Sequence, residues 1–262
     1  MAKNFEIPYN FCKEAIVGIA YKYKDKIDTI YVPAFYRHTR VTRIEIDNYP
    51  KTEDEYIDHI NFLQGLGFDV SILFQGGVVD KNIIDFYLDN GIRSFIVYDD
   101  ALAVMIKEIC PDTKITASIT KQLSPMDIKT MDLSMYDRIV LDFRLNDIDI
   151  LKDLPKKYKY ILMPNTPCYM DCPKERCQKH WFDGFEFQKG KFCNELGFCK
   201  PAWIDAKDLS VYDDYVELYK LQGREICDYS LLYYIMHYMD EYYASEDIKP
   251  FYWKDEFKYG NN

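Results

Sequence analysis

The chain has 262 residues, of which 48% are hydrophobic and 29% charged, and its formal net charge is −10. This length is enough for one α/β domain with a substantial core. The acidic balance disfavours nonspecific DNA binding, which requires a strong positive field. Apolar stretches fall short of the ~20 residues of a membrane span, and MAKNFEIPYN at the start does not resemble a signal peptide. We therefore expect a cytoplasmic protein without a membrane span.

Short apolar segments alternate with amphipathic ones along the chain. We expect strands at 29–35, 69–76, 93–99, 114–120, 137–143 and 158–165, and two more at 201–205 and 215–221. Helices are expected between them, at 52–68, 81–91, 101–110, 124–133 and 147–154, and a longer one at about 228–245. This alternation predicts a parallel sheet covered on both faces. We predict one domain over 1–262 that forms a complete or incomplete TIM-like (β/α) barrel, with an open doubly wound sheet as the alternative.

Local signals predict several helix ends. Thr52 followed by Glu55 indicates a capping box, and Gly91 indicates a C-cap. Ser124 before Pro125 is typical of a helix start. In the last helix, an apolar stripe is most simply a packing face, and its members are Leu231, Ile235, Tyr238 and Tyr242.

Five of the eight cysteines lie in one loop at 164–200, directly after the expected strand at 158–165. In a reducing cytoplasm, metal ligation or burial explains them better than disulfides. Four thiolates suit an iron–sulfur cluster or tetrahedral zinc, and the wide, uneven spacing favours the cluster over the paired knuckles of structural zinc. A set of thiols without a metal is the third possibility. The predicted ligands are Cys168, Cys172, Cys177 and Cys199, with Cys193 as the alternative to Cys199.

The three cysteines outside this loop stand alone in the sequence. We expect buried, inert thiols at Cys12, Cys110 and Cys227.

Basic residues follow the expected strand at 29–35. Arg37 and Arg40 suit a bidentate clamp for a phosphate or carboxylate, although a solvated loop partly neutralised by nearby carboxylates is the simpler explanation. Arg144, just after the expected strand at 137–143, also falls at the end of a strand. Two histidines, His38 and His180, are the candidates for moving a proton near neutral pH.

Three segments resemble the collagenase-like peptidase family U-32. They are DRIVLDFRLNDIDIL from 137, YILMPNTPCYMDCP from 160 and PAWIDAKDLSVYDDYVELYKLQGRE from 201. The last is similar to the family's "RPxDL…Y…FKxxGR" ending, with Lys220, Gly223 and Arg224 in place of its lysine, glycine and arginine. The cysteine spacing departs from that of the best-known members. The resemblance implies a barrel-like fold, an oxygen-sensitive 4Fe–4S cluster, and Arg144 at the rim.

Cluster-bearing members of that family act in oxygen-independent hydroxylation of RNA bases or of quinone precursors. We therefore expect a 4Fe–4S enzyme that modifies a small-molecule or macromolecular substrate and uses an electron donor or a homologous protein as partner. In this hypothesis, Arg37, Arg40, Arg144, Lys220 and Arg224 bind substrate. The alternatives are a metal-stabilised protein that binds a partner without catalysis, and a peptidase, as the family name suggests.

Overall fold

Eight parallel strands close into a barrel in the computed structural model, which describes residues 4–39, 49–76, 80–166, 169–171, 200–223 and 228–240. The strands are β1 (Phe5–Pro8), β2 (Ile27–Pro33), β3 (Val70–Leu73), β4 (Ser94–Val97), β5 (Lys114–Ala117), β6 (Arg138–Val140), β7 (Tyr160–Leu162) and β8 (Leu218–Lys220). Each strand pairs with its neighbours in the sequence, and β8 returns to β1 with Lys220 opposite Glu6. The predicted TIM-like barrel is confirmed and is complete, so the alternative of an open sheet is wrong.

The strand predictions differ from the structure at two places. The strand β1 was not predicted, because Glu6 and Pro8 interrupt its apolar pattern. The segment 201–205 is not a strand, although it contains the buried residues Ala202 and Ile204. It instead runs past the end of β7, where the backbone N–H of Ile204 donates to the carbonyl of Pro164 at 2.9 Å. With β1 present, the eight-strand barrel has no place for an additional strand.

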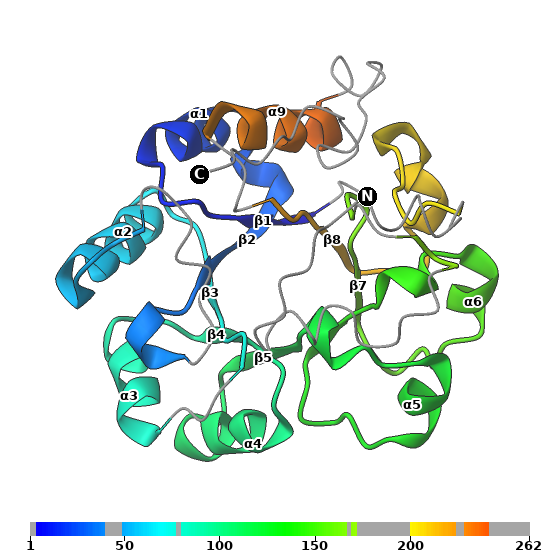
Figure 1. Cartoon of the computed structure of the whole chain (residues 1–262), viewed down its shortest axis with the longest axis horizontal. Coiled ribbons are helices and arrows are strands. Elements are labelled where there is room, and N and C mark those ends of the chain that lie inside the picture. The colour runs from blue at the N-terminus through cyan, green and yellow to red at the C-terminus, as the bar shows by residue number, and fades with distance from the viewer. Residues whose placement is uncertain are drawn as a thin grey trace, which may run out of the picture.

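Helices surround the barrel, as Figure 1 shows. They are α1 (Lys13–Tyr23), α2 (Glu53–Gly65), α3 (Lys81–Asp89), α4 (Asp100–Ile109), α5 (Pro125–Thr130), α6 (Ile148–Lys152) and α9 (Asp228–Met239). Single 3₁₀ turns follow several strands, among them η2 (Tyr36–His38), η3 (Ile119–Lys121) and η4 (Phe143–Leu145). Helix α1 was not expected from the sequence, and α9 lies beside it.

The predicted helix ends agree with the structure in most respects. Thr52 caps α2 by accepting from the backbone N–H of Glu55 at 3.1 Å, but the carboxylate of Glu55 accepts from Lys51 rather than from Thr52. The predicted capping box at Thr52 is therefore only half formed, because the preceding N–H is the one within reach. Ser124 forms a complete capping box with Asp127 at the start of α5.

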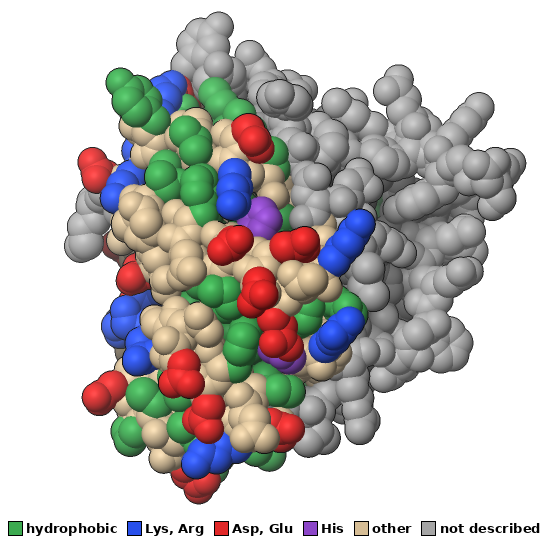
Figure 2. All heavy atoms as spheres, turned by 90° about the vertical axis from the view of Figure 1, so that its left-hand side faces the viewer, with side chains coloured by type: hydrophobic (Ala, Val, Ile, Leu, Met, Phe, Trp, Pro, Cys, Tyr) green, Lys and Arg blue, Asp and Glu red, His purple; other side chains and the backbone are tan. Residues whose placement is uncertain are grey.

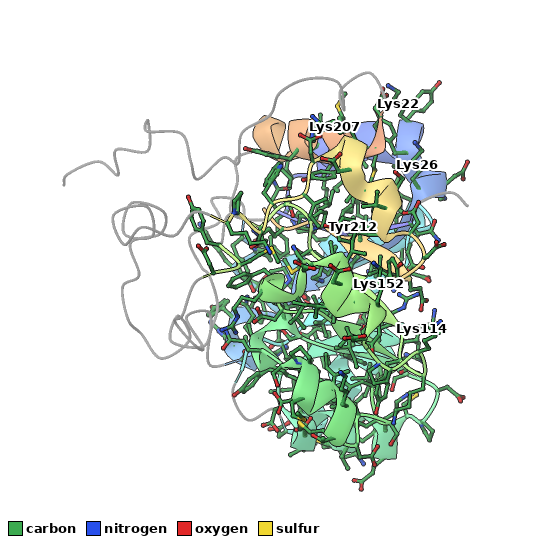
Figure 3. The ribbon with its side chains drawn as sticks, turned by 90° about the vertical axis from the view of Figure 1, so that its right-hand side faces the viewer. Lys22, Lys26, Lys114, Lys152, Lys207 and Tyr212 are labelled. Atoms are coloured by element: carbon green, nitrogen blue, oxygen red, sulfur yellow. The ribbon has the colours of Figure 1, made fainter. Side chains whose placement is uncertain are left out.

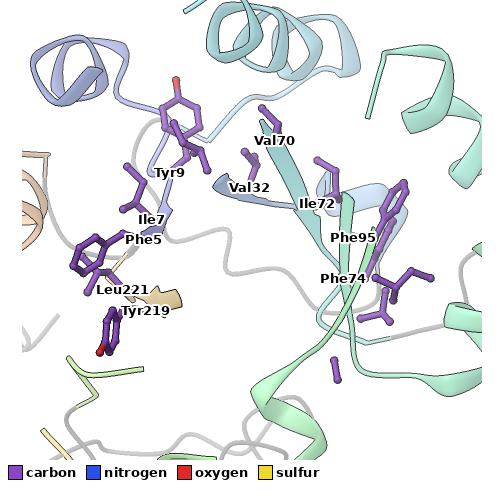
Figure 4. Packing of buried hydrophobic residues seen from close by; sticks show 14 of the residues in the cluster. Phe5, Ile7, Tyr9, Val32, Val70, Ile72, Phe74, Phe95, Tyr219 and Leu221 are labelled. Carbon is purple, nitrogen blue, oxygen red and sulfur yellow. The ribbon is translucent and has the colours of Figure 1, made fainter. Parts of the chain in front are cut away.

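The main hydrophobic core lies between the strands and the helices. Alternate strand residues face outward into it, and Figure 4 shows this arrangement for Phe5 and Ile7 on β1 and for Val70 and Ile72 on β3. Helix α9 contributes three members of the predicted stripe, Leu231, Ile235 and Tyr238, all of which are buried. The fourth, Tyr242, lies outside the described residues. Among the described helices, none is long and apolar enough to cross a membrane.

Charged residues mark the amino ends of the strands. Arg138 on β6 forms ion pairs with Asp28 on β2 at 2.7 Å and with Glu217 before β8 at 2.9 Å. Figure 3 shows Lys26 and Lys114, which lie at the amino ends of β2 and β5, on one side of the molecule. Figure 2 shows acidic side chains spread over the face that carries α2. The opposite, carboxyl ends of the strands are where parallel barrels keep their functional residues.

Candidate functional site

The inside of the barrel has two apolar walls. One consists of Tyr31, Leu73 and Ile96 on β2 to β4, which form a cluster apart from the main core. The second lies on β6 to β8, and its members are Val140, Ile161, Met163 and Leu218. Because successive strand residues point to opposite faces, these side chains face the lumen. We refer to the cluster of Tyr31, Leu73 and Ile96 as the β2–β4 wall.

A buried ion pair connects the first and last strands inside the lumen. The ammonium of Lys220 on β8 donates to the carboxylate of Glu6 on β1, and the two side chains are 5% and 4% exposed. The Nζ atom of Lys220 also lies 3.6 Å from the ring centroid of Tyr31, a cation–π distance. Lys220, predicted to bind substrate, is thus inside the barrel and held by Glu6. Its role in substrate binding stays a prediction.

A second ion pair lies at the carboxyl mouth, by which we mean the rim formed by the residues that follow the strands. Asp142, after β6, is buried and accepts from Nε and one terminal nitrogen of Arg144 at 2.8 and 2.9 Å. It also accepts from the backbone N–H of Arg144 at 2.9 Å, so the turn η4 positions both residues. Arg144 therefore lies at the end of a strand, as predicted, with a carboxylate as its partner.

Arg37 and His38 follow β2, but their described partners do not lie in the lumen. The Nε of Arg37 donates to the hydroxyl of Tyr36 at 2.9 Å, and its side chain is exposed. The ring of His38 is buried, with Nδ1 3.1 Å from the Tyr87 hydroxyl and Nε2 3.2 Å from the Glu53 carboxylate. These partners belong to helices α3 and α2. The structure therefore places His38 in the layer between sheet and helices and does not bring it to Lys220 or Arg144.

Burial lowers the pKa of His38, because a desolvated imidazolium is disfavoured, while the Glu53 carboxylate acts in the opposite direction. A neutral ring between a tyrosine hydroxyl and a carboxylate is well suited to packing. The catalytic role predicted for His38 remains untested.

Two asparagine side chains near the strand ends were not predicted as functional from the sequence. The side chain of Asn165, after β7, pairs with the backbone of Gln222, after β8, accepting at 2.9 Å and donating at 2.8 Å. Asn146, after η4, donates to the carbonyls of Met163 and Ala202 at 3.2 and 2.8 Å. These amides hold neighbouring loops of the mouth together. Asn at the end of a predicted strand would have identified Asn165, whereas Asn146 lies three residues beyond its predicted strand and has no such signal.

Most of the predicted cysteine site lies outside the described residues. This applies to Cys168, Cys172, Cys177, Cys193 and Cys199, and also to His180, Arg40 and Arg224. Of the lone cysteines, Cys12 is buried, as expected, Cys110 is only partly buried, and Cys227 is again outside the described part. Across the described segments, no three His, Cys, Asp or Glu side chains group to hold a metal ion.

The two ends of the cysteine loop are nevertheless joined by described residues. Tyr169 and Pro201 form an antiparallel bridge, and the N–H of Met170 donates to the carbonyl of Lys200 at 2.8 Å. The N–H of Lys200 in turn donates to the Asp171 carboxylate at 3.2 Å. We call these contacts the neck. The loop therefore leaves and returns to the barrel at one place, beside the carboxyl end of β7.

Comparison with known proteins relates the chain to others through its fold. No protein-family model and no curated protein matches the sequence. Among solved structures, the U32 peptidase Mk0906 is similar with a TM-score of 0.55 and 14% identity, over 85% of this chain and 93% of that one. A GH18 chitinase from Pseudoalteromonas aurantia has a TM-score of 0.51 and 12% identity, over 90% and 99% of the two chains. The barrel is thus similar to that of a U32 peptidase, and at these identities the likeness concerns the fold alone.

Proposed function

We propose that this protein is an iron–sulfur enzyme of the U-32 type that acts at the carboxyl mouth of its barrel. The neck is the observation that carries the proposal. It joins residues that are sequence neighbours of three predicted ligands, because Cys168 precedes Tyr169, Cys172 follows Asp171 and Cys199 precedes Lys200. The fold likeness to a U32 peptidase supports the same proposal.

The neck matters because cluster ligands must converge. Adjacent Cα atoms are about 3.8 Å apart, so a residue next to the neck stays near it whatever path the rest of the loop follows. The proposal therefore favours Cys199, the sequence neighbour of Lys200 in the neck, over Cys193 as the fourth ligand. Four such sulfurs fit a 4Fe–4S cluster, and zinc is the other metal that would accept them.

The residues of the mouth would serve such an enzyme in distinct ways. A 4Fe–4S cluster supplies one-electron transfer, which fits oxygen-independent hydroxylation or related redox chemistry with an external electron donor. The two apolar walls are buried, and a flat nucleobase-like or quinone-like group bound at the mouth would meet an apolar surface at their upper ends. Lys220 and Arg144, each held by its carboxylate, would orient the substrate as fixed dipoles.

The experiment is metal analysis of protein purified without exposure to air. We expect iron and acid-labile sulfide in equal amounts, with a broad visible absorption that oxygen bleaches. Cys172→Ala and Cys199→Ala should lose the iron, whereas the matched control Cys110→Ala, at the C-terminal end of α4, should retain it. Stoichiometric zinc without sulfide, or iron content unchanged in both loop variants, would refute the cluster. A Cys172→Ala protein that keeps its activity but loses stability would favour the metal-stabilised binding protein instead, whereas lost activity in an intact fold would favour the enzyme.

A further inference from the structure

Side chains with an unsatisfied buried oxygen gather at the carboxyl mouth. Within the part of the chain that the structure describes, an oxygen without a hydrogen-bond partner occurs in Gln75, Gln122, Asn146 and Thr166. They follow β3, β5, β6 and β7, so four of the eight strand ends contribute. Buried polar atoms in proteins are nearly always hydrogen-bonded, because an unmade bond costs the full desolvation of the group. A ligand at the mouth would supply the missing hydrogen bond to any of these oxygens that faces it.

Gln75 is the member that faces the lumen. Phe74, one residue beyond β3, still pairs with β4, because its N–H donates to the Ile96 carbonyl at 2.9 Å, and its ring packs outward against Tyr87 and Phe95. We therefore place the next side chain, Gln75, on the opposite face. Gln75 shares that inward face with Leu73, a member of the β2–β4 wall. It is only 7% exposed. Its amide therefore lies at the top of an apolar wall.

Among the described residues, two basic side chains in this part of the barrel are each paired with a carboxylate. Lys220 is paired with Glu6 inside the lumen, and Arg144 is paired with Asp142 at the mouth. A ligand carrying a net charge would have to replace one of these partners or remain uncompensated in a desolvated place. A neutral ligand meets neither obstacle, and a carboxamide such as Gln75 presents a donor and an acceptor side by side.

We infer that Gln75 is a specificity-determining residue, which recognises an uncharged ligand by an amide-type edge. The ligand's N–H and C=O groups pair with the Gln75 amide, and the flat apolar group that carries them lies against the β2–β4 wall. This inference rests on the proposed function only in placing the substrate at the carboxyl mouth. It requires neither the cluster nor a particular reaction.

Benzamide and benzoate are suitable probes, because both carry a phenyl ring, and the substituent is a neutral amide in benzamide and a charged carboxylate in benzoate. Titration of the full-length protein, followed by ligand-observed NMR, should show benzamide binding about tenfold more tightly than benzoate, the effect of the hydrogen bonds of one amide. Gln75→Leu should lose about tenfold in benzamide affinity. The matched control is Gln64→Leu on α2, whose amide bonds to the Asn90 carbonyl outside the barrel, and it should bind benzamide normally. Gln75→Glu should favour benzamidine, which is cationic, over benzamide.

Thermal unfolding gives a readout that is independent of any ligand. Because the buried oxygen of Gln75 has no partner, Gln75→Leu should keep or raise Tm. A Tm lowered more than in Gln64→Leu would mean that the amide serves the protein itself, and the inference would be overturned. It would likewise be overturned if the wild-type chain bound neither probe, preferred benzoate, or bound benzamide equally well after Gln75→Leu. If the inference fails in one of these ways while Gln75→Leu retains its iron, the failure concerns Gln75 alone and leaves the cluster proposal standing.

Discussion

The ion pair between Glu6 and Lys220 provides the sharpest test of the barrel interior. Both side chains are at most 5% exposed, so the removal of one partner leaves the other charge buried without compensation. We expect Glu6→Met and Lys220→Met each to lower the free energy of unfolding by about 3–5 kcal/mol. Lys220→Met also removes the cation–π contact with Tyr31, which adds up to about 2 kcal/mol at a desolvated site.

The double variant separates the pair from the cost of each buried charge. With both charges replaced by methionine, neither remains unpaired, and such replacements are often neutral or stabilising by about 1–4 kcal/mol. We therefore expect the double variant to be more stable than either single variant, with a large coupling energy in the mutant cycle. The control is Lys159→Met, which breaks an exposed pair with Glu217 at 3.4 Å and should cost less than about 1 kcal/mol.

Equilibrium unfolding in urea measures all of these variants at neutral pH. Because the folded contacts are otherwise unchanged, the slope of the free energy against urea should stay constant while the midpoint moves. Single variants that cost no more than Lys159→Met would refute a buried, charged pair. A double variant whose loss equals the sum of the single losses would show that the two groups are not coupled.

Two further predictions concern the dependence of stability on pH. Burial holds the pKa of His38 below its ordinary value, so the unfolded chain takes up a proton before the folded one as the pH falls. The free energy of unfolding should therefore decrease below about pH 6.5. In urea titrations between about pH 7.5 and 5.5, His38→Gln should show a smaller decrease than wild type, and an equal decrease would contradict this prediction. Burial opposes the ionisation of Asp28, but the Arg138 guanidinium outweighs this effect and lowers the pKa of Asp28. The ion pair therefore stabilises the fold above about pH 4, and its contribution to the free energy of unfolding is lost as the pH falls further. Arg138→Met should therefore lie furthest below wild type at neutral pH and approach it near pH 3 in the same assay; a difference independent of pH would rule out this linkage.

The barrel was predictable because its strands are buried on both faces. Segments such as VSIL in β3 and SFIV in β4 form short apolar runs between helical patterns, and that periodicity depends only on neighbours in the sequence. The first strand escaped detection for a physical reason. Its Glu6 is a strand residue only because Lys220, 214 positions further along the chain, meets it inside the closed lumen.

The site was predictable only as a set of residue types near strand ends. Arg144 lies at the carboxyl mouth, as its position after a strand predicts, yet the carboxylate that holds it is visible only in the turn η4. His38 also follows a strand, but the turn η2 directs it outward to Tyr87. His38 lies inside the turn η2, where the alternation of strand β2 no longer applies, so its direction could not be predicted from its distance to the strand.

The sequence by itself determined the alternation of strands and helices, several helix caps, and the concentration of cysteines after β7. These depend on interactions between residues close together in the chain. Only the tertiary structure decided that the sheet closes, that Glu6 neutralises Lys220, and that the cysteine loop begins and ends at one neck. Such pairings join residues far apart in the sequence, and the free energy that selects them comes from burial and charge in the folded barrel.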